Sequence, residues 1–247
     1  MQTLTSNSQS QTQIRWGVKM AKYNVFETKD DWAKFRRGLF TASEVHRLLA
    51  EPKLKADKEA GNLSEGAKTY VRERVAILLA PEEPQHYNSN MERGNEAEPQ
   101  AVLAYAESIG MSINSNGFIY TSVGGFVFFT DEDHNAGGTP DVILNDKPFS
   151  IIGEIKCPLS KTHLEYMMIS NAEDLKKAVP QYYSQMQMNM WLCNADKGDF
   201  ISFDDRYYNP SHHLHIVNIP RDEEHIELIK SKLLKAKEYK DQILKTI

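Results

Sequence analysis

The 247-residue sequence has few of the residues that mark a disulfide-bonded, metal-thiolate or membrane protein. Its cysteines are Cys157 and Cys193, too few for a four-thiolate zinc or iron–sulfur site. No apolar run approaches the roughly 20 residues of a membrane helix, and the polar start MQTLTSNSQSQTQ lacks the apolar core of a secretory signal. We therefore expect a soluble protein in a reducing cytoplasm, with residues 1–29 as a flexible leader and residues 30–247 as a single domain.

Positive charge is also scarce, because 29 Lys and Arg residues face 34 Asp and Glu residues, which gives a net charge of −5. The charge is unevenly distributed along the chain. Residues 1–80 hold 14 basic and 9 acidic residues, whereas residues 81–247 hold 15 and 25. A basic N-terminal third suits a local surface that binds nucleic acid, although an ordinary uneven surface charge explains the same counts equally well.

Hydrophobic periodicity predicts early helices, a strand-rich middle and a final helix. The expected helices cover residues 31–49 with a turn at Gly38 and a restart near Thr41 or Ser43, then 64–79, 91–108, 179–193 and 222–247. The expected strands cover residues 117–120, 125–129, 141–144, 150–156, 200–203 and 215–219. This order favours an α/β fold of the mixed α+β kind, in which helices flank a central mixed β-sheet.

Charged residues gather at the ends of two of these strands. Asp141 opens one strand, and Glu154 and Lys156 are two residues apart on the next, so their side chains share one face. Ile155 between them points into the core. A turn over residues 145–148 makes the two strands antiparallel neighbours and brings Asp141 close to Glu154. Two carboxylates and an ammonium group therefore converge at one place.

This arrangement predicts a metal site. Neighbouring carboxylates raise each other's pKa unless a cation compensates, and oxygen ligands with room for water suit Mg²⁺. Lys156 could then lower the pKa of a bound water or hold the attacking hydroxide. Taken alone, Glu154 and Lys156 fit an exposed ion pair on an edge strand better than they fit a metal site. Asp141, and Glu98 as a further carboxylate from the helix over residues 91–108, shift the balance toward a two-metal site; Glu92 and Glu96 lie on other helix faces.

The same residues resemble a known family. Pro140-Asp141, Glu154-Ile155-Lys156 and Glu98 are similar to the PD-(D/E)XK nuclease superfamily, and the match is closer to the bacteriophage lambda exonuclease family of viral alkaline exonucleases. The similarity covers about residues 30–240, and TASEVH and EIKCP are its most specific parts. Its segments are DDWAKFRRGLFTASEVHRLLAEPK, MERGNEAE, GTPD, GEIKCP, SQMQMNMW and LHIVNIPRDE, in that order.

The resemblance implies a restriction-endonuclease-like core and a processive 5′-to-3′ exonuclease on linear double-stranded DNA. Such an enzyme releases 5′-mononucleotides and leaves 3′ single-stranded tails for recombination by annealing. The implied assembly is a homotrimeric ring around the duplex, working with a single-strand annealing protein in a bacterial host's cytoplasm and encoded by a phage or prophage. The implied cofactor is Mg²⁺, two ions per site, which Mn²⁺ can replace.

The resemblance also assigns roles to individual residues. Asp141 would bridge the metals, Glu154 and the Ile155 carbonyl would hold one ion, and Glu98 would help to hold the other. Lys156 would activate water with help from Gln185.

Other residues match positions that handle the DNA end. Arg36, Ser43 and Thr139 match positions that bind the terminal 5′-phosphate, a set of donors that suits an anion. Met91 matches an apolar wedge that splits the end base pair, or equally a core residue at a helix start.

One departure from the family pattern and two other functions stay open. The connection over residues 121–138 is longer than in the family and carries Asp131-Glu132-Asp133, which either reshapes the DNA entrance or forms a solvated turn. An endonuclease or resolvase of the same superfamily would use the same metal site without needing Arg36. A catalytically inactive module that binds DNA ends is the third possibility, against which the complete set of charged site residues argues.

Overall fold

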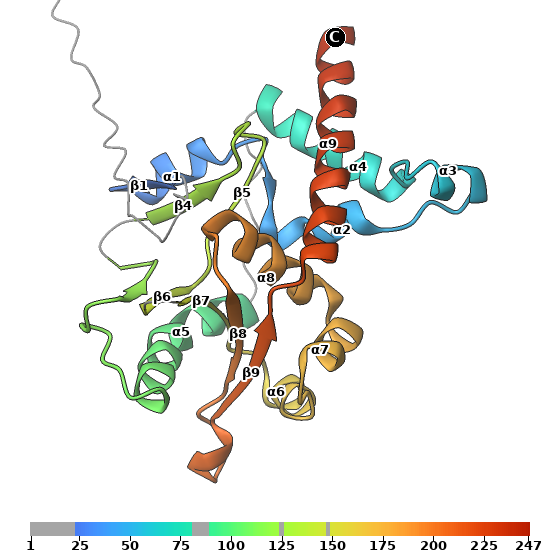
Figure 1. The fold of residues 1–247 in the computed structure, drawn as a ribbon. Helices are drawn as coiled ribbons and strands as arrows, with labels where there is room; N and C mark the ends of the chain where they lie inside the picture. The colour runs from blue at the N-terminus through green and yellow to red at the C-terminus, as the bar shows by residue number, and fades with distance from the viewer. Residues whose placement is uncertain (1–22, 81–88, 124–125, 147–148) are drawn as a thin grey trace, which may run out of the picture.

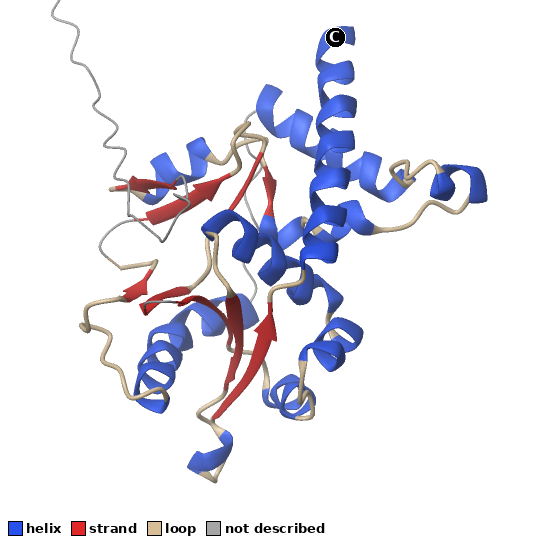
Figure 2. Cartoon of the chain, viewed as in Figure 1, coloured by secondary structure: helices blue, strands red, loops and turns tan. Residues whose placement is uncertain are grey.

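The computed structural model describes residues 23–80, 89–123, 126–146 and 149–247, which form two β-sheets and the helices around them (Figure 1). Figure 2 shows the helices gathered around the strands, with the long C-terminal helix projecting from the body. No helix in these residues is long and apolar enough to cross a membrane. The α/β fold expected from the sequence is confirmed.

The larger sheet is the mixed sheet that the sequence predicts. Its strand order is β3-β6-β7-β8-β9, in which β7 and β8 are parallel and the other neighbours antiparallel. The strands are β3 (Phe118–Tyr120), β6 (Val142–Asp146), β7 (Phe149–Lys156), β8 (Lys197–Phe203) and β9 (Leu214–Pro220). Asp141 therefore lies one residue before its strand instead of opening it.

A second, four-stranded sheet was not expected. Its order is β1-β4-β5-β2, and its strands are β1 (Tyr23–Phe26), β4 (Phe126–Thr130), β5 (Ala136–Gly138) and β2 (Phe40–Thr41). Strand β1 lies inside the expected leader, so the boundary placed at residue 29 is too late; residues 1–22 lie outside the described residues. Strand β5 lies within the connection expected over residues 121–138. Gly137 is required there, because a Cβ atom would overlap the Phe128 ring.

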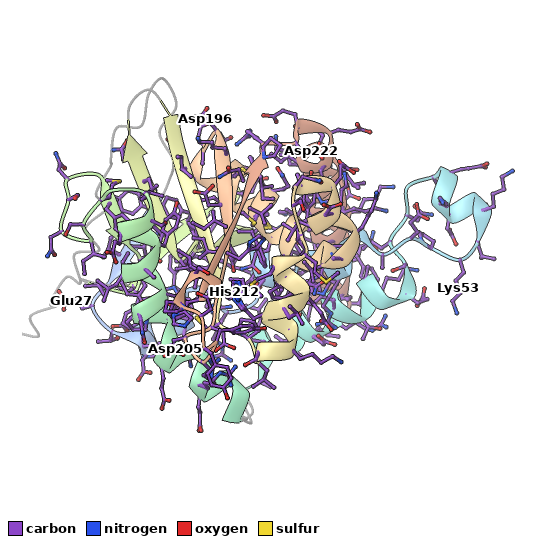
Figure 3. All side chains as sticks on the ribbon, turned by 90° about the horizontal axis from the view of Figure 1, so that it is seen from below. Glu27, Lys53, Asp196, Asp205, His212 and Asp222 are labelled. Carbon is purple, nitrogen blue, oxygen red and sulfur yellow. The ribbon has the colours of Figure 1, made fainter. Side chains whose placement is uncertain are left out.

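Each predicted helical segment contains a helix, and the described residues add three short helices that the sequence did not predict. The helices are α1 (Lys29–Phe35), α2 (His46–Leu49), α3 (Lys55–Glu59), α4 (Glu65–Leu79), α5 (Ser89–Ser108), α6 (Ser160–Met167), α7 (Ala172–Ala178), α8 (Pro180–Cys193) and α9 (Glu223–Thr246), with 3₁₀ turns η1 (Ala42–Glu44) and η2 (Pro210–His212). The helix expected from Thr41 or Ser43 is only η1 and the short α2, because Phe40 and Thr41 pair with β5. Helix α3 lies on an arm that projects from the body beside Lys53 (Figure 3).

Helices α5 and α8 cover opposite faces of the larger sheet. Ile155 and Ile201 pack with α5, whereas Ile152 and Phe200 belong to the cluster that contains the buried side of α8. Helix α8 also packs against β4, β5 and η1, so it joins the two sheets. Pro180 at its first turn and Asn194 in the left-handed region after its last turn fix its ends.

The acidic run after β4 is a tight turn. The Asp131 side chain accepts hydrogen bonds from the backbone N–H groups of Asn135 (2.7 Å) and Ala136 (2.9 Å), while Glu132 and Asp133 are exposed. Asp131 therefore organises the β4–β5 hairpin.

Candidate active site

The hairpin of β6 and β7 brings Asp141 and Glu154 together as expected. Val142 pairs with Gly153, and continuing this register places Asp141 opposite Glu154 on the face that α8 covers. One carboxylate oxygen of Asp141 accepts a hydrogen bond of 2.6 Å from the backbone N–H of Ile155. Glu154 is only 1% exposed, so its charge needs nearby partners.

Lys156 and Gln185 share one oxygen of Glu154. The Lys156 ammonium donates to Glu154 Oε1 at 2.7 Å, and the Gln185 side-chain amide donates to the same oxygen at 2.5 Å. The ammonium also lies 4.7 Å from the centre of the Tyr182 ring. Burial alone lowers the pKa of Lys156, but the charges of Glu154 and Asp141 outweigh this effect and hold the pKa above its usual value. Lys156 is therefore positively charged in this site.

Glu98 approaches the site from α5, on the other side of the sheet. Its Oε1 accepts a hydrogen bond of 2.9 Å from the Tyr120 hydroxyl. Burial and the charge of Glu154 raise the pKa of Asp141 well above its usual range, Lys156 opposes this, and Glu98 adds to it. Three acidic side chains therefore act on one another with Lys156 as the nearby cation, whereas Glu92 and Glu96 are exposed.

The donor set fits a hard cation. Glu154 Oε2 is buried and has no hydrogen-bond partner within the described structure, an arrangement that is unfavourable unless a ligand completes it. Within the described residues no three His, Cys, Asp or Glu side chains are grouped closely enough to enclose an ion. Mg²⁺ does not require such a cage, because it keeps several waters and takes one or two carboxylates. Asp141 and Glu154 are the two carboxylates that would serve such an ion.

The residues matched to the terminal phosphate lie on neighbouring segments. Strands β2 and β5 are parallel, with Thr41 paired to Gly137, so Ser43 and Thr139 follow their strands at the same end of the smaller sheet. Ser43 is exposed, with its hydroxyl 3.3 Å from that of Thr41, and the Thr139 hydroxyl donates to the Val127 carbonyl at 2.6 Å.

The other two end-handling residues are less fully defined. Arg36 ends α1, with its guanidinium 4.3 Å from the centre of the Trp32 ring. The side chain of Met91 lies outside the described part of the chain, so its role as a wedge stays a prediction.

Three supporting residues were not found from the sequence. Tyr182 lies three residues before Gln185 on one helix face, so helical spacing alone could have indicated it. Tyr120 meets Glu98 only because β3 pairs with β6, which no local pattern reveals. Arg93 donates to the Cys157 carbonyl (3.0 Å), the Pro158 carbonyl (2.9 Å) and the Asp204 carboxylate (3.0 Å), and so ties α5 to the end of β7.

Histidine and cysteine side chains near the site have structural partners. His213 and His215 bond to the backbone carbonyls of Tyr207 and Ile169, each at 2.8 Å. Burial raises the pKa of the Cys157 thiol to about 12, so it remains a thiol at neutral pH. These groups serve packing and backbone bonding.

Comparison with known proteins places this geometry in a family. The structure is similar to an alkaline exonuclease, LHK-Exo, from Laribacter hongkongensis, with 25% identity, a TM-score of 0.63 and coverage of 88% of this chain and 95% of that one. It is also similar to a phage-related exonuclease from Haemophilus somnus 129PT, with 28% identity, a TM-score of 0.65 and coverage of 84% and 96%. No curated protein sequence matches. Residues 31–196, which include Asp141, Glu154, Lys156 and Gln185, match the model of one family, and the chain belongs to it: the YqaJ-like viral recombinase domains.

Proposed function

We propose that this chain is a metal-dependent 5′-to-3′ exonuclease that degrades one strand of linear double-stranded DNA from its end. Membership of the viral recombinase family, with similarity to two exonucleases, indicates a nuclease acting on DNA. The observation that carries the finer proposal is the buried, unpartnered oxygen of Glu154 beside Asp141, with Lys156 and Gln185 on its other oxygen.

Asp141, Glu154, the Ile155 carbonyl and Glu98 would hold two Mg²⁺ ions, which Mn²⁺ can replace. When bound, the ions would polarise the scissile phosphate and favour ionisation of the attacking water.

The protein's own groups supply orientation and charge. Gln185 holds the Glu154 carboxylate in place, and the Tyr182 ring supports the Lys156 ammonium from beside it. The ammonium has donors left to orient a water toward the phosphate and to stabilise the negative charge that develops there.

Recognition of the DNA end would give the reaction its direction. Arg36, Ser43 and Thr139 would bind the terminal 5′-phosphate, and the Thr139 hydroxyl would leave the Val127 carbonyl to do so. Met91 would separate the end base pair. Cleavage at a fixed distance from the bound phosphate then releases a mononucleotide, and a structure of LHK-Exo in complex with dAMP supports a product of this kind.

The proposal includes partners. Three copies would form a ring around the duplex, and the 3′ tails would pass to a single-strand annealing protein in the cytoplasm of a bacterial host carrying the phage or prophage gene.

The test is digestion of linear duplex DNA with 5′-phosphate or 5′-hydroxyl ends, with a closed circle alongside, in Mg²⁺. Lys156→Ala removes the ammonium and should lower kcat by about 10²–10⁴-fold, the usual contribution of a positioned acid–base group. Arg36→Gln should remove the preference for 5′-phosphate. Arg37→Gln is its matched control, because Arg37 donates to the Ile77 and Ala80 carbonyls at the end of α4.

Fast release of mononucleotides from phosphorylated ends, an intact circle and an inactive Lys156→Ala variant support the exonuclease. A nicked or linearised circle, with activity independent of Arg36, would instead show an endonuclease. Binding of ends without cleavage under any condition would show an inactive end-binding module.

A further inference from the structure

Asn189 is a fully buried amide with no hydrogen-bond partner at either end. Its exposure is 0%, and both Oδ1 and Nδ2 lack partners in the described structure. No other described side chain has two such atoms. Buried polar groups are normally satisfied, so a group like this one needs a physical explanation.

The neighbouring polar residues of α8 are satisfied. Ser184 donates to the Pro180 carbonyl at 2.9 Å, and Gln185 donates to Glu154. Gln187 donates to the Pro220 carbonyl at 2.9 Å and accepts from the Asp222 N–H at 2.8 Å. The unmet amide is therefore a particular property of Asn189 and does not extend along the helix.

Asn189 faces the segments that carry the proposed phosphate ligands. It lies four residues after Gln185, so the two share one face of α8. A Cβ atom on Gly138 would overlap Asn189 Oδ1 and lie 2.8 Å from the Cβ of Ala42. Gly138 precedes Thr139 and Ala42 precedes Ser43, so the amide lies against the residue before Thr139, where that residue meets the one before Ser43.

We propose that Asn189 is a positioning residue for the terminal-phosphate pocket. Its amide gains partners when the segments around Ala42 and Gly138 close on a bound 5′-phosphate, and it remains unsatisfied in the free protein. The strain of the unmet amide is thus relieved only in the complex. Through Gln185 and Asn189, one face of α8 positions both the Glu154 carboxylate and the wall of the phosphate pocket. This inference rests on the proposed function, which supplies the pocket.

The experiment compares Asn189→Leu, which is close in shape and apolar, with Gln187→Leu as the matched control. Thermal stability is measured without metal, together with the ratio of affinities for 5′-phosphorylated and 5′-hydroxyl duplex ends by fluorescence anisotropy. Asn189→Leu should be at least as stable as wild type. Its ratio of affinities should fall about tenfold, which corresponds to about 1.4 kcal/mol. Gln187→Leu should lose stability and keep the ratio. Asn189→Ser, which cannot overpack against Gly138, should lower the ratio in the same way.

The outcomes separate this inference from the proposed function. If wild type shows no preference for 5′-phosphate, the pocket itself is wrong and the inference falls with it. If wild type shows the preference and both Asn189 variants keep it, only the inference is overturned. A folded but less stable Asn189→Leu also overturns it, since the amide would then be satisfied in the free protein by a buried water. If Asn189→Leu does not fold, the ratio for Asn189→Ser decides.

Discussion

At the scale of single residues, Asp141 is a residue of the site whose ionised side chain is destabilised by its surroundings. Burial and Glu154 raise its pKa, so the ionised carboxylate is less stable in the folded protein than in the unfolded chain. The charge of Lys156 and the hydrogen bond from Ile155 partly offset this. A metal site of the proposed kind would trade stability for the ability to bind a cation.

Asp141→Asn should therefore stabilise the metal-free protein while it abolishes cleavage. The amide oxygen can still accept from Ile155, and the repulsion with Glu154 disappears. We expect a gain of about 1 kcal/mol at pH 7, or a rise in Tm of roughly 2–4 °C. Because the folded pKa is raised, the stabilising effect of protonation is present at low pH and lost as the pH rises, so the difference between variant and wild type should shrink toward about pH 4.

Thermal denaturation in EDTA and in Mg²⁺ measures both effects. Mg²⁺ should raise the Tm of wild type more than that of Asp141→Asn, because only wild type retains both carboxylates. A variant that is less stable than wild type in EDTA would show that the carboxylate is not under electrostatic stress.

The site residues that could be predicted from the sequence are those whose relative positions follow from their spacing along the chain. Asp141, Glu154 and Lys156 follow from strand alternation and one turn, and the structure brings them together. Asn189 could not be predicted, because an asparagine within an apolar helix gives no sign of its partners. Its unmet amide depends on how β5 and η1 pack on α8.

At the scale of elements, the Arg93 side chain ties the first turns of α5 to the ends of two strands beside the site. Arg93 joins this helix to the backbone after β7 and to Asp204 at the end of β8. Asp204 is fully buried and also accepts from Arg206 at 2.7 Å. Because Glu98 lies one and a half turns further along α5, the position of this carboxylate follows that of Arg93.

Arg93→Gln should lower the free energy of unfolding by about 2–3 kcal/mol, because it removes charge-assisted hydrogen bonds and leaves Asp204 with fewer partners. It should also raise the Mg²⁺ concentration needed for half-maximal activity more than it lowers kcat. Urea denaturation and a Mg²⁺ titration measure these effects. The double variant with Asp204→Asn should lose less than the sum of the single variants; strictly additive losses would show that the two residues act independently.

Asp204 also predicts a dependence of stability on pH. Burial acts to raise its pKa, but hydrogen bonds from Arg206 and Ser160 outweigh burial and hold the pKa well below its usual value. The ionised group therefore contributes stability above about pH 4, the unfolded value, and this contribution is lost as the pH falls toward the lower folded pKa. In urea denaturation, wild type should exceed Asp204→Asn clearly at pH 7, and the gap should narrow steadily as the pH falls below about 4. A gap that stays constant would exclude this role.

Elements with strong periodicity were predicted, and those defined by tertiary pairing were not. Helix α9 lies where the periodicity predicts it and buries Ile226, Ile229 and Leu233. Strand β5 was not predicted, because its glycines are required by close packing but are rare in strands. Strand β1 was not predicted, because it follows a polar segment. The smaller sheet therefore emerges only when distant segments are brought together.

At the scale of the whole molecule, the net charge of −5 limits how DNA can be held. A chain of this charge does not attract duplex DNA over long distances, since attraction needs an excess of positive charge. Binding must therefore rely on local groups such as Arg36 and the site cations. The proposed end recognition would satisfy this requirement, because it would involve only a few phosphates.

The affinity for a 5′-phosphorylated duplex end should consequently fall only moderately with salt. With about four phosphate contacts, the slope of log K against log [salt] should be about −3 to −4. Fluorescence anisotropy over a KCl series, in EDTA to prevent cleavage, measures this slope, and closed circular DNA serves as a competitor without ends. Circles should compete weakly, because they lack the phosphate that the pocket recognises. A slope twice as steep, with circles competing as well as linear DNA, would mean that the protein grips the body of the duplex, and the terminal phosphate would then not be what directs this chain to DNA.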